Sequence, residues 1–418
     1  MTEKEAKRAF EEMRKAGADD NAILGTLYSL FQDDKIDINE LGALVNVLGY
    51  ELTEEFKNMS PEDQKVKGYE ENPADDSAEE DGVKNDEELN RIKGCMFGGA
   101  IGDALGYPVE FMSYDSIRRK YGERGIESYD LCGGKALVSD DTQMTLFTAQ
   151  GLLNGEADGE ITTEKIYFAY LDWLKTQGYS VKCGYKGKYR LSDCKDLNYS
   201  RAPGNTCLTA LSSGSMGVRK NRINTSKGCG GVMRVAPIGL FIDKFDGDFD
   251  KVAFFAADAA AITHGHELGY IPAAALAYIV AKLYKGAELI DAIENCIKAI
   301  DKLFPNAWHL KEFDDIMRKA IDLSAQDYED EYAINRIGQG WVGEEALAIA
   351  VYCALKYKND FKKAICAAVN HGGDSDSTGA IAGNISGTYL GYKKIPAEYL
   401  DDIELKDLLN KISHDLAF

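Results

Sequence analysis

The chain has 418 residues, 45% of them hydrophobic and 10% aromatic, and a formal net charge of −21 at pH 7. This composition is typical of a soluble globular protein with a large core, and it excludes a disordered chain. So large an excess of acidic groups disfavours binding along a nucleic-acid backbone or on an anionic membrane, although backbone N–H groups can still hold a small anion in a local pocket.

The negative charge is concentrated in the N-terminal part of the chain. Residues 1–90 contain 10 basic and 25 acidic side chains, a net charge of −15. The other residues carry 38 basic and 44 acidic side chains, a net charge of only −6. The acidity is therefore mostly a property of the first 90 residues.

Cysteine usage and apolar segments indicate the compartment. The nine cysteines form no C-x-x-C pair and are odd in number, which favours a reducing environment over a disulfide framework. The start, MTEKEAKRAFEEMRK, lacks the apolar region of a signal peptide. The apolar stretch IPAAALAYIVAKL at 271–283 is too short to span a bilayer and predicts a core helix. We therefore expect a cytoplasmic protein.

Residues 1–58 are expected to form a small helical module. Short segments have helical periodicity, among them INELGALVNVLGY. The region resembles the second half of an EF-hand in which Ile36 and Glu40 would be loop positions 8 and 12. Positions 3 and 6 would then be Phe31 and Asp34, where the calcium loop needs an oxygen ligand and a glycine. We expect no calcium here, and the sequence names no partner for this module.

A linker and a large helical domain are expected to follow. Residues 59–88 are acidic and polar without periodicity, which is typical of a linker. From residue 89 the chain is rich in alanine and glycine, with apolar segments of helix length and few that alternate with period two. We predict an all-α fold, with a large and mostly helical domain over 89–418 and functional residues on glycine-rich loops between helices.

The stretch RIKGCMFGGAIGDALGYPVEF, residues 91–111, contains glycines at three- and four-residue spacing. Such spacing flattens one face of a helix, and we interpret it as a site of close helix packing. Asp103 and Glu110 are harder to explain by packing. Glu110 comes just after Pro108, where a loop can present its carboxylate to a site.

Two stretches far apart in the chain each place carboxyl and hydroxyl groups at the start of an apolar helix. The first is LVSDDTQMTLF at 137–147, and the second is HGGDSDSTGAIAG at 371–383. Helix capping alone would explain either one. Together they offer an oxygen-only ligand set that suits Mg²⁺ or Mn²⁺, and they could supply the two sides of a paired-metal site.

A glycine-rich stretch, SKGCGGVMRVAPIGL at 226–240, could bring backbone N–H groups close to phosphate oxygens. It has neither the ending of a P-loop nor the spacing of a dinucleotide-binding fingerprint. The histidines of AITHGHELGY, His264 and His266, would by themselves suggest only a structural role.

In this order, the six motifs GCMFGGAIGDALGYPVEF, SDDTQMTLF, RAPGNTCLTAL, KGCGGVMRVAPIGLF, ITHGHELGY and NHGGDSDSTGAIAG resemble the ADP-ribosylglycohydrolase family. This family includes dinitrogenase reductase-activating glycohydrolase and the ADP-ribosylarginine hydrolases. The resemblance covers about residues 90–400. It implies a compact all-α fold and the removal of ADP-ribose from a modified protein side chain, or another ADP-ribose conjugate, at a centre of two Mg²⁺ or Mn²⁺ ions.

Position by position, the resemblance also implies roles for individual residues. The implied metal ligands are Ser139, Asp140, Asp141, Asp374, Asp376 and Ser377. Glu110 matches a mobile acidic residue near the metals, and Glu110 and Asp376 are the candidate catalytic carboxylates. The loop Gly228, Cys229, Gly230 and Gly231 is implied to hold the diphosphate or distal ribose, and His264 to lie near the substrate.

Two positions depart from the family pattern. Cys229 replaces an asparagine that is common in that loop, and Ala202 stands where arginine-specific members have an aspartate that can hold a guanidinium group. The cleaved bond could therefore be an ester, an ether or another N-glycoside. Two other functions remain open, namely a Mg²⁺-dependent phosphoryl hydrolase acting on a nucleotide-like substrate, and a non-catalytic relative that binds ADP-ribose or has a structural role.

Overall fold

The computed structural model describes residue 10, residues 43–44, 76–181 and 184–418. The chain divides into two compact units, residues 1–83 and 84–418. Most of the first unit lies outside the described residues, and so does the helical module expected over 1–58, apart from Phe10, Ala43 and Leu44. These three residues are helical.

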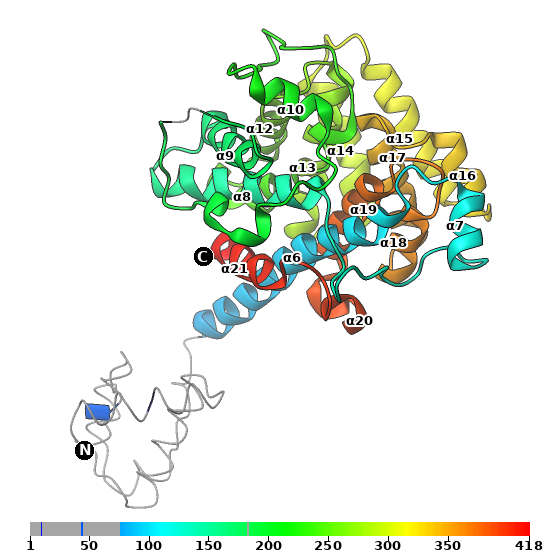
Figure 1. Ribbon diagram of the computed structural model, residues 1–418, viewed down its shortest axis with the longest axis horizontal. Coiled ribbons are helices and arrows are strands. Elements are labelled where there is room, and N and C mark those ends of the chain that lie inside the picture. The colour runs from blue at the N-terminus through cyan, green and yellow to red at the C-terminus, as the bar shows by residue number, and fades with distance from the viewer. Residues whose placement is uncertain (1–9, 11–42, 45–75, 182–183) are drawn as a thin grey trace, which may run out of the picture. The chain divides into compact units, whose positions relative to one another are not determined.

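The all-α prediction is confirmed, because the described residues form helices and no β-strand (Figure 1). The α-helices are α6 (Asp76–Gly106), α7 (Tyr114–Tyr121), α8 (Asp140–Ala157), α9 (Thr163–Thr176), α10 (Asn205–Ser212), α11 (Ala236–Leu240), α12 (Phe249–Ala261), α13 (Glu267–Tyr284), α14 (Leu289–Leu303), α15 (Leu310–Ser324), α16 (Asp330–Ile337), α17 (Gly343–Lys356), α18 (Phe361–Val369), α19 (Ser375–Leu390), α20 (Ala397–Leu400) and α21 (Lys406–Ala417). Short 3₁₀ turns lie at η1 (Tyr107–Val109), η2 (Leu191–Asp193), η3 (Lys195–Leu197), η4 (Cys229–Gly231), η5 (Ile242–Phe245) and η6 (Tyr392–Lys394).

Helix α6 begins inside the range that the sequence predicts to be a linker. It starts at Asp76, so the part of 59–88 that follows this residue is helical rather than irregular. This stretch contains no proline and begins with several acidic residues, which favour the positive end of a helix. The lack of apolar periodicity shows that this segment has no side that faces a core. A segment of this kind can still form the exposed first turns of a longer helix.

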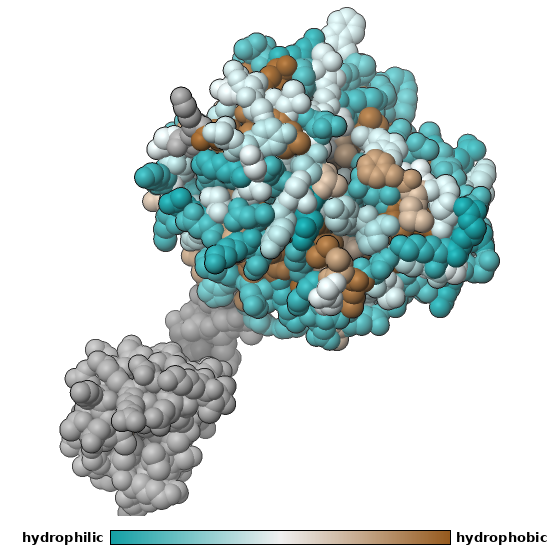
Figure 2. Space-filling view, in the orientation of Figure 1, coloured by the Kyte–Doolittle hydropathy of each residue, from teal (hydrophilic) through white to brown (hydrophobic). Residues whose placement is uncertain are grey.

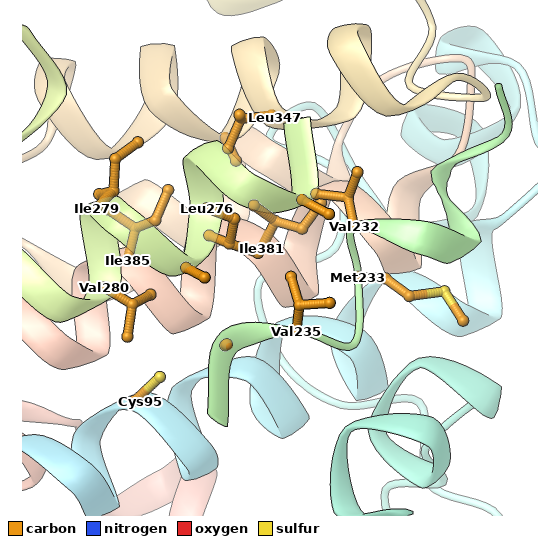
Figure 3. Close-up of a cluster of buried hydrophobic side chains, with 14 of the residues drawn as sticks. Cys95, Val232, Met233, Val235, Leu276, Ile279, Val280, Leu347, Ile381 and Ile385 are labelled. Carbon is orange, nitrogen blue, oxygen red and sulfur yellow. The ribbon is translucent and has the colours of Figure 1, made fainter. Parts of the chain in front are cut away.

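The core of residues 84–418 is built around α13, which packs against α12, α11, α14, α17 and α19. Nearly every residue of α13 is buried, as its apolar sequence predicts. Figure 3 shows Leu276, Ile279 and Val280 of this helix close to Ile381 and Ile385 of α19. Val232 and Met233, which follow the loop Gly228 to Gly231 (the glycine loop), and Val235 at the start of α11 belong to the same cluster. The glycine loop is therefore anchored to the core.

Helices α6 and α19 pack antiparallel with their backbones almost in contact. A Cβ atom added at Gly94, Gly98 or Gly102 would lie 1.9–2.2 Å from a backbone oxygen of α19. The same holds from the other side, where a Cβ at Gly383 would lie 1.9 Å from the Gly98 oxygen. Only glycine fits this seam, which confirms the packing interpretation of the glycine spacing.

The surface of residues 84–418 can be followed on one face of the molecule. The face drawn in Figure 2 is mostly hydrophilic, with hydrophobic residues in small scattered groups. Among the described helices, none combines the length and the apolar character needed to cross a bilayer.

Candidate metal centre and active site

The start of α8 is held in place by a buried carboxylate. Ser139 is the N-cap of this helix, and its hydroxyl accepts a hydrogen bond from the Asp141 N–H. The Asp103 carboxylate accepts from the Ser139 N–H at 2.9 and 3.0 Å and from the Thr142 N–H at 3.1 Å. The Thr142 hydroxyl donates to the same carboxylate at 2.5 Å. Asp103 on α6 therefore positions the first turn of α8, which carries Asp140 and Asp141.

The start of α19 presents a second carboxylate pair. Asp374 is the N-cap of this helix, and its own N–H donates to the Gln339 carbonyl at 2.8 Å. The Ser377 N–H donates to Asp376 Oδ1 at 2.9 Å and more weakly to Asp374 Oδ1 at 3.4 Å. The other Asp374 oxygen, Oδ2, accepts a hydrogen bond from the Cys229 thiol. One Asp376 oxygen lies near carboxylate oxygens of Asp374 and Glu110.

Glu110 joins these carboxylates from the end of η1. Its N–H donates to the Gly106 carbonyl at 3.0 Å, which continues the last turn of α6. One carboxylate oxygen from each of Glu110, Asp374 and Asp376 lies within 4.8 Å of the other two. Glu110 is half-buried, whereas both aspartates are buried. The loop position predicted for Glu110 does direct its side chain to the site.

These groups line one pocket of about 320 Å³. Two of the residues expected at the site, Ser139 and Gly231, do not line it. Ser139 is fully buried beneath Asp140 and Asp141. Gly231 packs against α13, since a Cβ there would lie 2.6 Å from the Gly269 oxygen. The lining residues are Glu110, Phe111, Asp140, Asp141, Ala202, Pro203, Gly204, Asn205, Thr206, Cys207, Gly228, Cys229, Gly230, Met233, His264, Trp341, Asp374, Asp376 and Ser377.

Burial and mutual repulsion destabilise the ionised carboxylates of the cluster, and a bound cation would offset this destabilisation. Burial, with repulsion from Asp376 second, raises the pKa of Glu110 to about 9 and that of Asp103 to about 7. Burial also raises the pKa values of Asp140, Asp141 and Asp374 well above their ordinary range. Asp141 Oδ2 is buried and has no hydrogen-bond partner among the described residues. Buried carboxylates and an unpaired oxygen are hard donors that a divalent cation would satisfy, so these residues fit such an ion.

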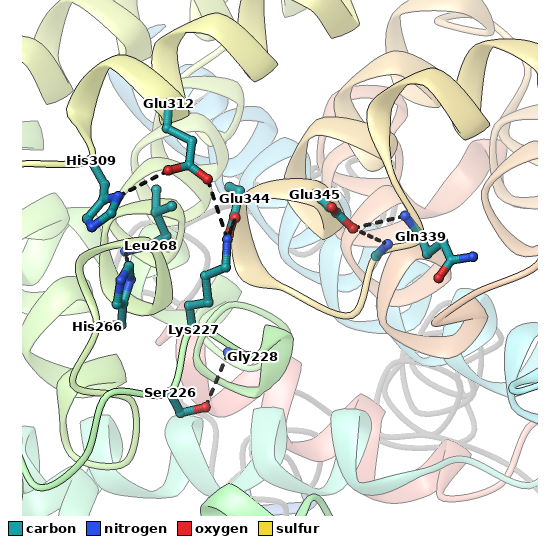
Figure 4. A network of polar contacts seen from close by, with 11 residues as sticks. Ser226, Lys227, Gly228, His266, Leu268, His309, Glu312, Gln339, Glu344 and Glu345 are labelled. Atoms are coloured by element: carbon teal, nitrogen blue, oxygen red, sulfur yellow. Dashed lines mark hydrogen bonds and ion pairs between the residues drawn. The ribbon is translucent and has the colours of Figure 1, made fainter.

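The glycine loop is tied to the segment before α17. The Cys229 N–H donates to the Trp341 carbonyl at 3.3 Å, and the Gly343 N–H donates to the Lys227 carbonyl at 2.9 Å. Figure 4 shows the Lys227 ammonium group paired with Glu344 and, at 3.5 Å, with Glu312. The backbone of the loop is therefore fixed by the segment that leads into α17.

The hydrogen bonds around His264 fit a neutral ring that carries its proton on Nε2. The buried Arg234 guanidinium donates to Thr263 Oγ1 at 2.7 Å, and Thr263 Oγ1 lies 2.8 Å from His264 Nδ1. Because arginine only donates, the threonine hydroxyl can donate its single proton to Nδ1. Nε2 then carries the imidazole proton and faces the loop, where a Cβ at Gly228 would lie 3.5 Å away. Burial, with Arg234 second, lowers the pKa of His264 to about 3, so the ring is neutral.

Two aromatic residues that the sequence does not predict at the site, Phe111 and Trp341, also line the pocket. The rings of Phe111 and Trp341 stack with centroids 5.0 Å apart and planes 21° apart. Phe111 has a left-handed φ of 64° and is 74% exposed. Left-handed backbone in a bulky residue is strained, and such strain is common at functional sites. No local sequence signal marks Phe111, because its role depends on Trp341 from a distant segment.

The two departures from the family pattern both lie in this pocket. Ala202 lines it with a left-handed φ of 48°. Cys229 lies against the second carboxylate pair, where its thiol donates to Asp374 Oδ2 at 2.8 Å. The Ser377 hydroxyl in turn donates to the Cys229 sulfur at 3.5 Å.

Comparisons with known proteins give matches over most of this chain. A family model described as ADP-ribosylglycohydrolase matches residues 84–417. The ADP-ribosylhydrolase ARH3 of Mus musculus is 24% identical, over 76% of this chain and 88% of its own length. The ADP-ribosyl-[dinitrogen reductase] glycohydrolase of Rhodospirillum rubrum is also 24% identical, over 76% of this chain and 91% of its own. A solved structure titled "ADP-ribosylglycohydrolase-related protein complex" is similar in fold, with a TM-score of 0.58 and 22% identity over 79% of this chain and 98% of that one.

Proposed function

Because this chain belongs to the ADP-ribosylglycohydrolase family and is a hydrolase acting on ADP-ribose glycosyl bonds, we propose that it removes ADP-ribose from a modified side chain with the help of two divalent cations. One observation carries the proposal. Carboxylates from three distant parts of the chain, Glu110, the start of α8 and the start of α19, converge in a single pocket.

The residues that would hold the cations are those of the two helix starts. Asp140 and Asp141 come from α8, and Asp374, Asp376 and Ser377 come from α19. Mg²⁺ and Mn²⁺ both bind such oxygen ligands. When bound, the ions would polarise the ribose oxygens and lower the pKa of a bound water.

The remaining groups bind and orient the substrate. The neutral His264 offers its Nε2–H to an acceptor oxygen, and Gly228 and Gly230 leave room beside it for a ribose or phosphate group. Cleavage at the anomeric carbon builds positive charge on the sugar, which the surrounding carboxylates stabilise.

Glu110 is the best placed proton acceptor. It is the least buried of the carboxylates, and its pKa rises in the cluster because burial and negative neighbours favour its protonated form. With that pKa the carboxyl is protonated at neutral pH, so Glu110 can accept a proton from the attacking water only in its ionised form, which nearby cations would favour.

The proposal is tested by mass spectrometry of ADP-ribose released from proteins modified on arginine, serine or a carboxylate, with and without added Mg²⁺ or Mn²⁺. We expect metal-dependent release from at least one linkage, and a loss of at least 100-fold in Asp376→Ala. The matched control is Asp322→Ala, which removes an exposed aspartate of α15 and should keep full activity.

Other outcomes would support the competing functions. Release of phosphate or AMP instead of ADP-ribose would identify a phosphoryl hydrolase. Binding of ADP-ribose without release from any linkage would identify a non-catalytic relative. Full activity of the Asp376→Ala variant would contradict the proposed site.

A further inference from the structure

The thiol of Cys229 lies among groups that we propose as metal ligands, rather than in the part of the pocket that would hold the sugar. Its sulfur is 2.8 Å from Asp374 Oδ2 and 3.5 Å from Ser377 Oγ. The backbone N–H of Cys229 is bound to the Trp341 carbonyl, and this bond fixes the loop from which the thiol extends.

These separations can be compared with those of atoms that share one ion. Metal–sulfur bonds are about 2.3 Å and metal–oxygen bonds about 2.1 Å, so neighbouring donors on a tetrahedral or octahedral ion lie about 3.1–3.6 Å apart. The separation from Ser377 Oγ, 3.5 Å, lies within this range, and the separation from Asp374 Oδ2, 2.8 Å, is about 0.3 Å shorter than its lower end because the thiol donates a hydrogen bond there. Small side-chain movements would therefore bring the sulfur, the Asp374 carboxylate and the Ser377 hydroxyl onto one ion.

Two further observations point to an ion on this side of the pocket. The buried Asp141 carboxylate has an oxygen without a partner among the described residues, and it faces the same pocket as the thiol. A second sulfur, Met233 Sδ, lies 3.9 Å from the Ser377 hydroxyl. Sulfur is a poor ligand for Mg²⁺ and a good one for Zn²⁺ or Co²⁺.

We propose that Cys229 is a metal ligand, and that the position next to Asp374 and Ser377 takes a cation that binds sulfur, such as Zn²⁺ or Co²⁺. This inference rests on the metal centre of the proposed function and deepens it. The unpaired Asp141 oxygen would complete this position, and Asp140 and Asp376 would provide a hard, oxygen-bound position for the second ion. Binding forms one metal–sulfur bond and releases the thiol proton to solvent, with no change of oxidation state.

The test is a Co²⁺ titration of the full-length, metal-stripped protein, followed by near-ultraviolet absorption. Sulfur bound to Co²⁺ gives a charge-transfer band that oxygen ligands do not give. We expect this band in the wild-type protein and its loss in Cys229→Ser. This variant should bind Zn²⁺ at least tenfold more weakly, with a smaller change in the affinity for Mg²⁺.

The matched control is Cys207→Ser, the same substitution at the other thiol that lines the pocket. The Cys207 sulfur is contacted by Arg234 at 3.3 Å and by none of the proposed ligands, so this variant should keep the band. Stoichiometric Co²⁺ binding without a band, or a band that persists in Cys229→Ser, would overturn the inference and leave the oxygen-bound centre intact. A protein that binds neither Co²⁺ nor Mg²⁺ would overturn the centre and the inference together.

Discussion

Ala202 occupies an unusual backbone conformation in the pocket. Its φ of 48° is left-handed, a region that aspartate and asparagine adopt more readily than alanine. The sequence resemblance places an aspartate here in arginine-specific relatives. The methyl group of Ala202 cannot bind a guanidinium group, and an aspartate would adopt this backbone conformation with less strain.

We therefore predict that Ala202→Asp shifts the linkage preference towards arginine. A charge-assisted hydrogen bond to guanidinium contributes about 1.5–3 kcal/mol, which corresponds to a gain of about tenfold or more in kcat/KM for ADP-ribosyl-arginine relative to the serine-linked substrate. Parallel release assays on the two substrates measure the ratio. Ala202→Asn is the control, because it has the same backbone preference without the charge. An equal shift in both variants would contradict the electrostatic explanation.

Thr263 is predicted to set the imidazole tautomer of His264. In the wild-type protein, nitrogen NMR of the five histidines should show His264 with its proton on Nε2. Thr263→Val removes the hydroxyl that faces Nδ1, so both tautomers should become populated and kcat/KM should fall about twofold or more, because only the ring with its proton on Nε2 can donate to the substrate. Thr263→Ser keeps the hydroxyl and should preserve the wild-type spectrum. A proton on Nδ1 in the wild-type protein would refute the assignment.

The residues that the sequence identifies at the site are those with local signals. Two pairs of carboxylates lie next to or near each other at helix starts, Asp140 with Asp141 and Asp374 with Asp376. Because like charges repel, such a pair indicates a function such as binding a cation. Residues whose role depends on tertiary contacts are harder to find. The sequence singles out Asp103 but does not predict that it holds the start of α8, because that role depends on the contact between α6 and α8. Phe111 and Trp341 come from segments that are far apart in the chain.

At the scale of elements, the seam between α6 and α19 links the fold to the site. Gly102 and Gly106 of α6 approach the first turns of α19, and the end of α6 leads directly to Glu110. The glycine spacing predicts this kind of packing but not its partner helix. The sequence does not predict the start of α6 at Asp76, because a charged segment without an apolar stripe has no signal that separates it from a linker.

We predict that Gly383→Ala destabilises the protein by about 3 kcal/mol or more, since overpacking usually costs about 1–3 kcal/mol and here the obstacle is a backbone carbonyl. The new Cβ would lie 1.9 Å from the Gly98 oxygen, so the helices would have to separate. Urea denaturation measures the change in the free energy of unfolding. Gly184→Ala is the control, because nothing lies within 4 Å of the added Cβ at that position. Equal stability of the two variants would contradict a tight seam.

At the scale of the whole molecule, the carboxylate cluster links stability to pH and metal. Burial and negative neighbours raise the pKa of Glu110 to about 9 and of Asp103 to about 7, far above their values in an unfolded chain. The folded protein therefore holds protons that the unfolded chain has released, and its stability falls as the pH rises through this range. The buried His264 and His371, with pKa values lowered to about 3 and about 4, are neutral in both states above about pH 7 and do not oppose this trend.

We predict that the metal-free protein melts several degrees lower at about pH 9 than at about pH 7. Saturating Mn²⁺ should reduce this difference, because the cation offsets the repulsion between ionised carboxylates. Calorimetry with a chelator and with Mn²⁺ measures both melting temperatures. The same pH dependence in the two conditions would show that the carboxylates of the pocket do not control stability.

The backbone contact between α6 and α19 has a further consequence for catalysis. Because Gly94, Gly98 and Gly102 each meet a glycine of the other helix, a shift of α19 by one residue along α6 would force side chains into backbone carbonyls. The register of the two helices is thus locked. Glu110 follows the C-terminal end of one helix and Asp374 caps the N-terminal start of the other, so the register also sets how far apart these two carboxylates lie. The glycines of α6 and α19 therefore help to set the distance between Glu110 and Asp374, on which the binding of a pair of ions would depend, from as far as about four helical turns away.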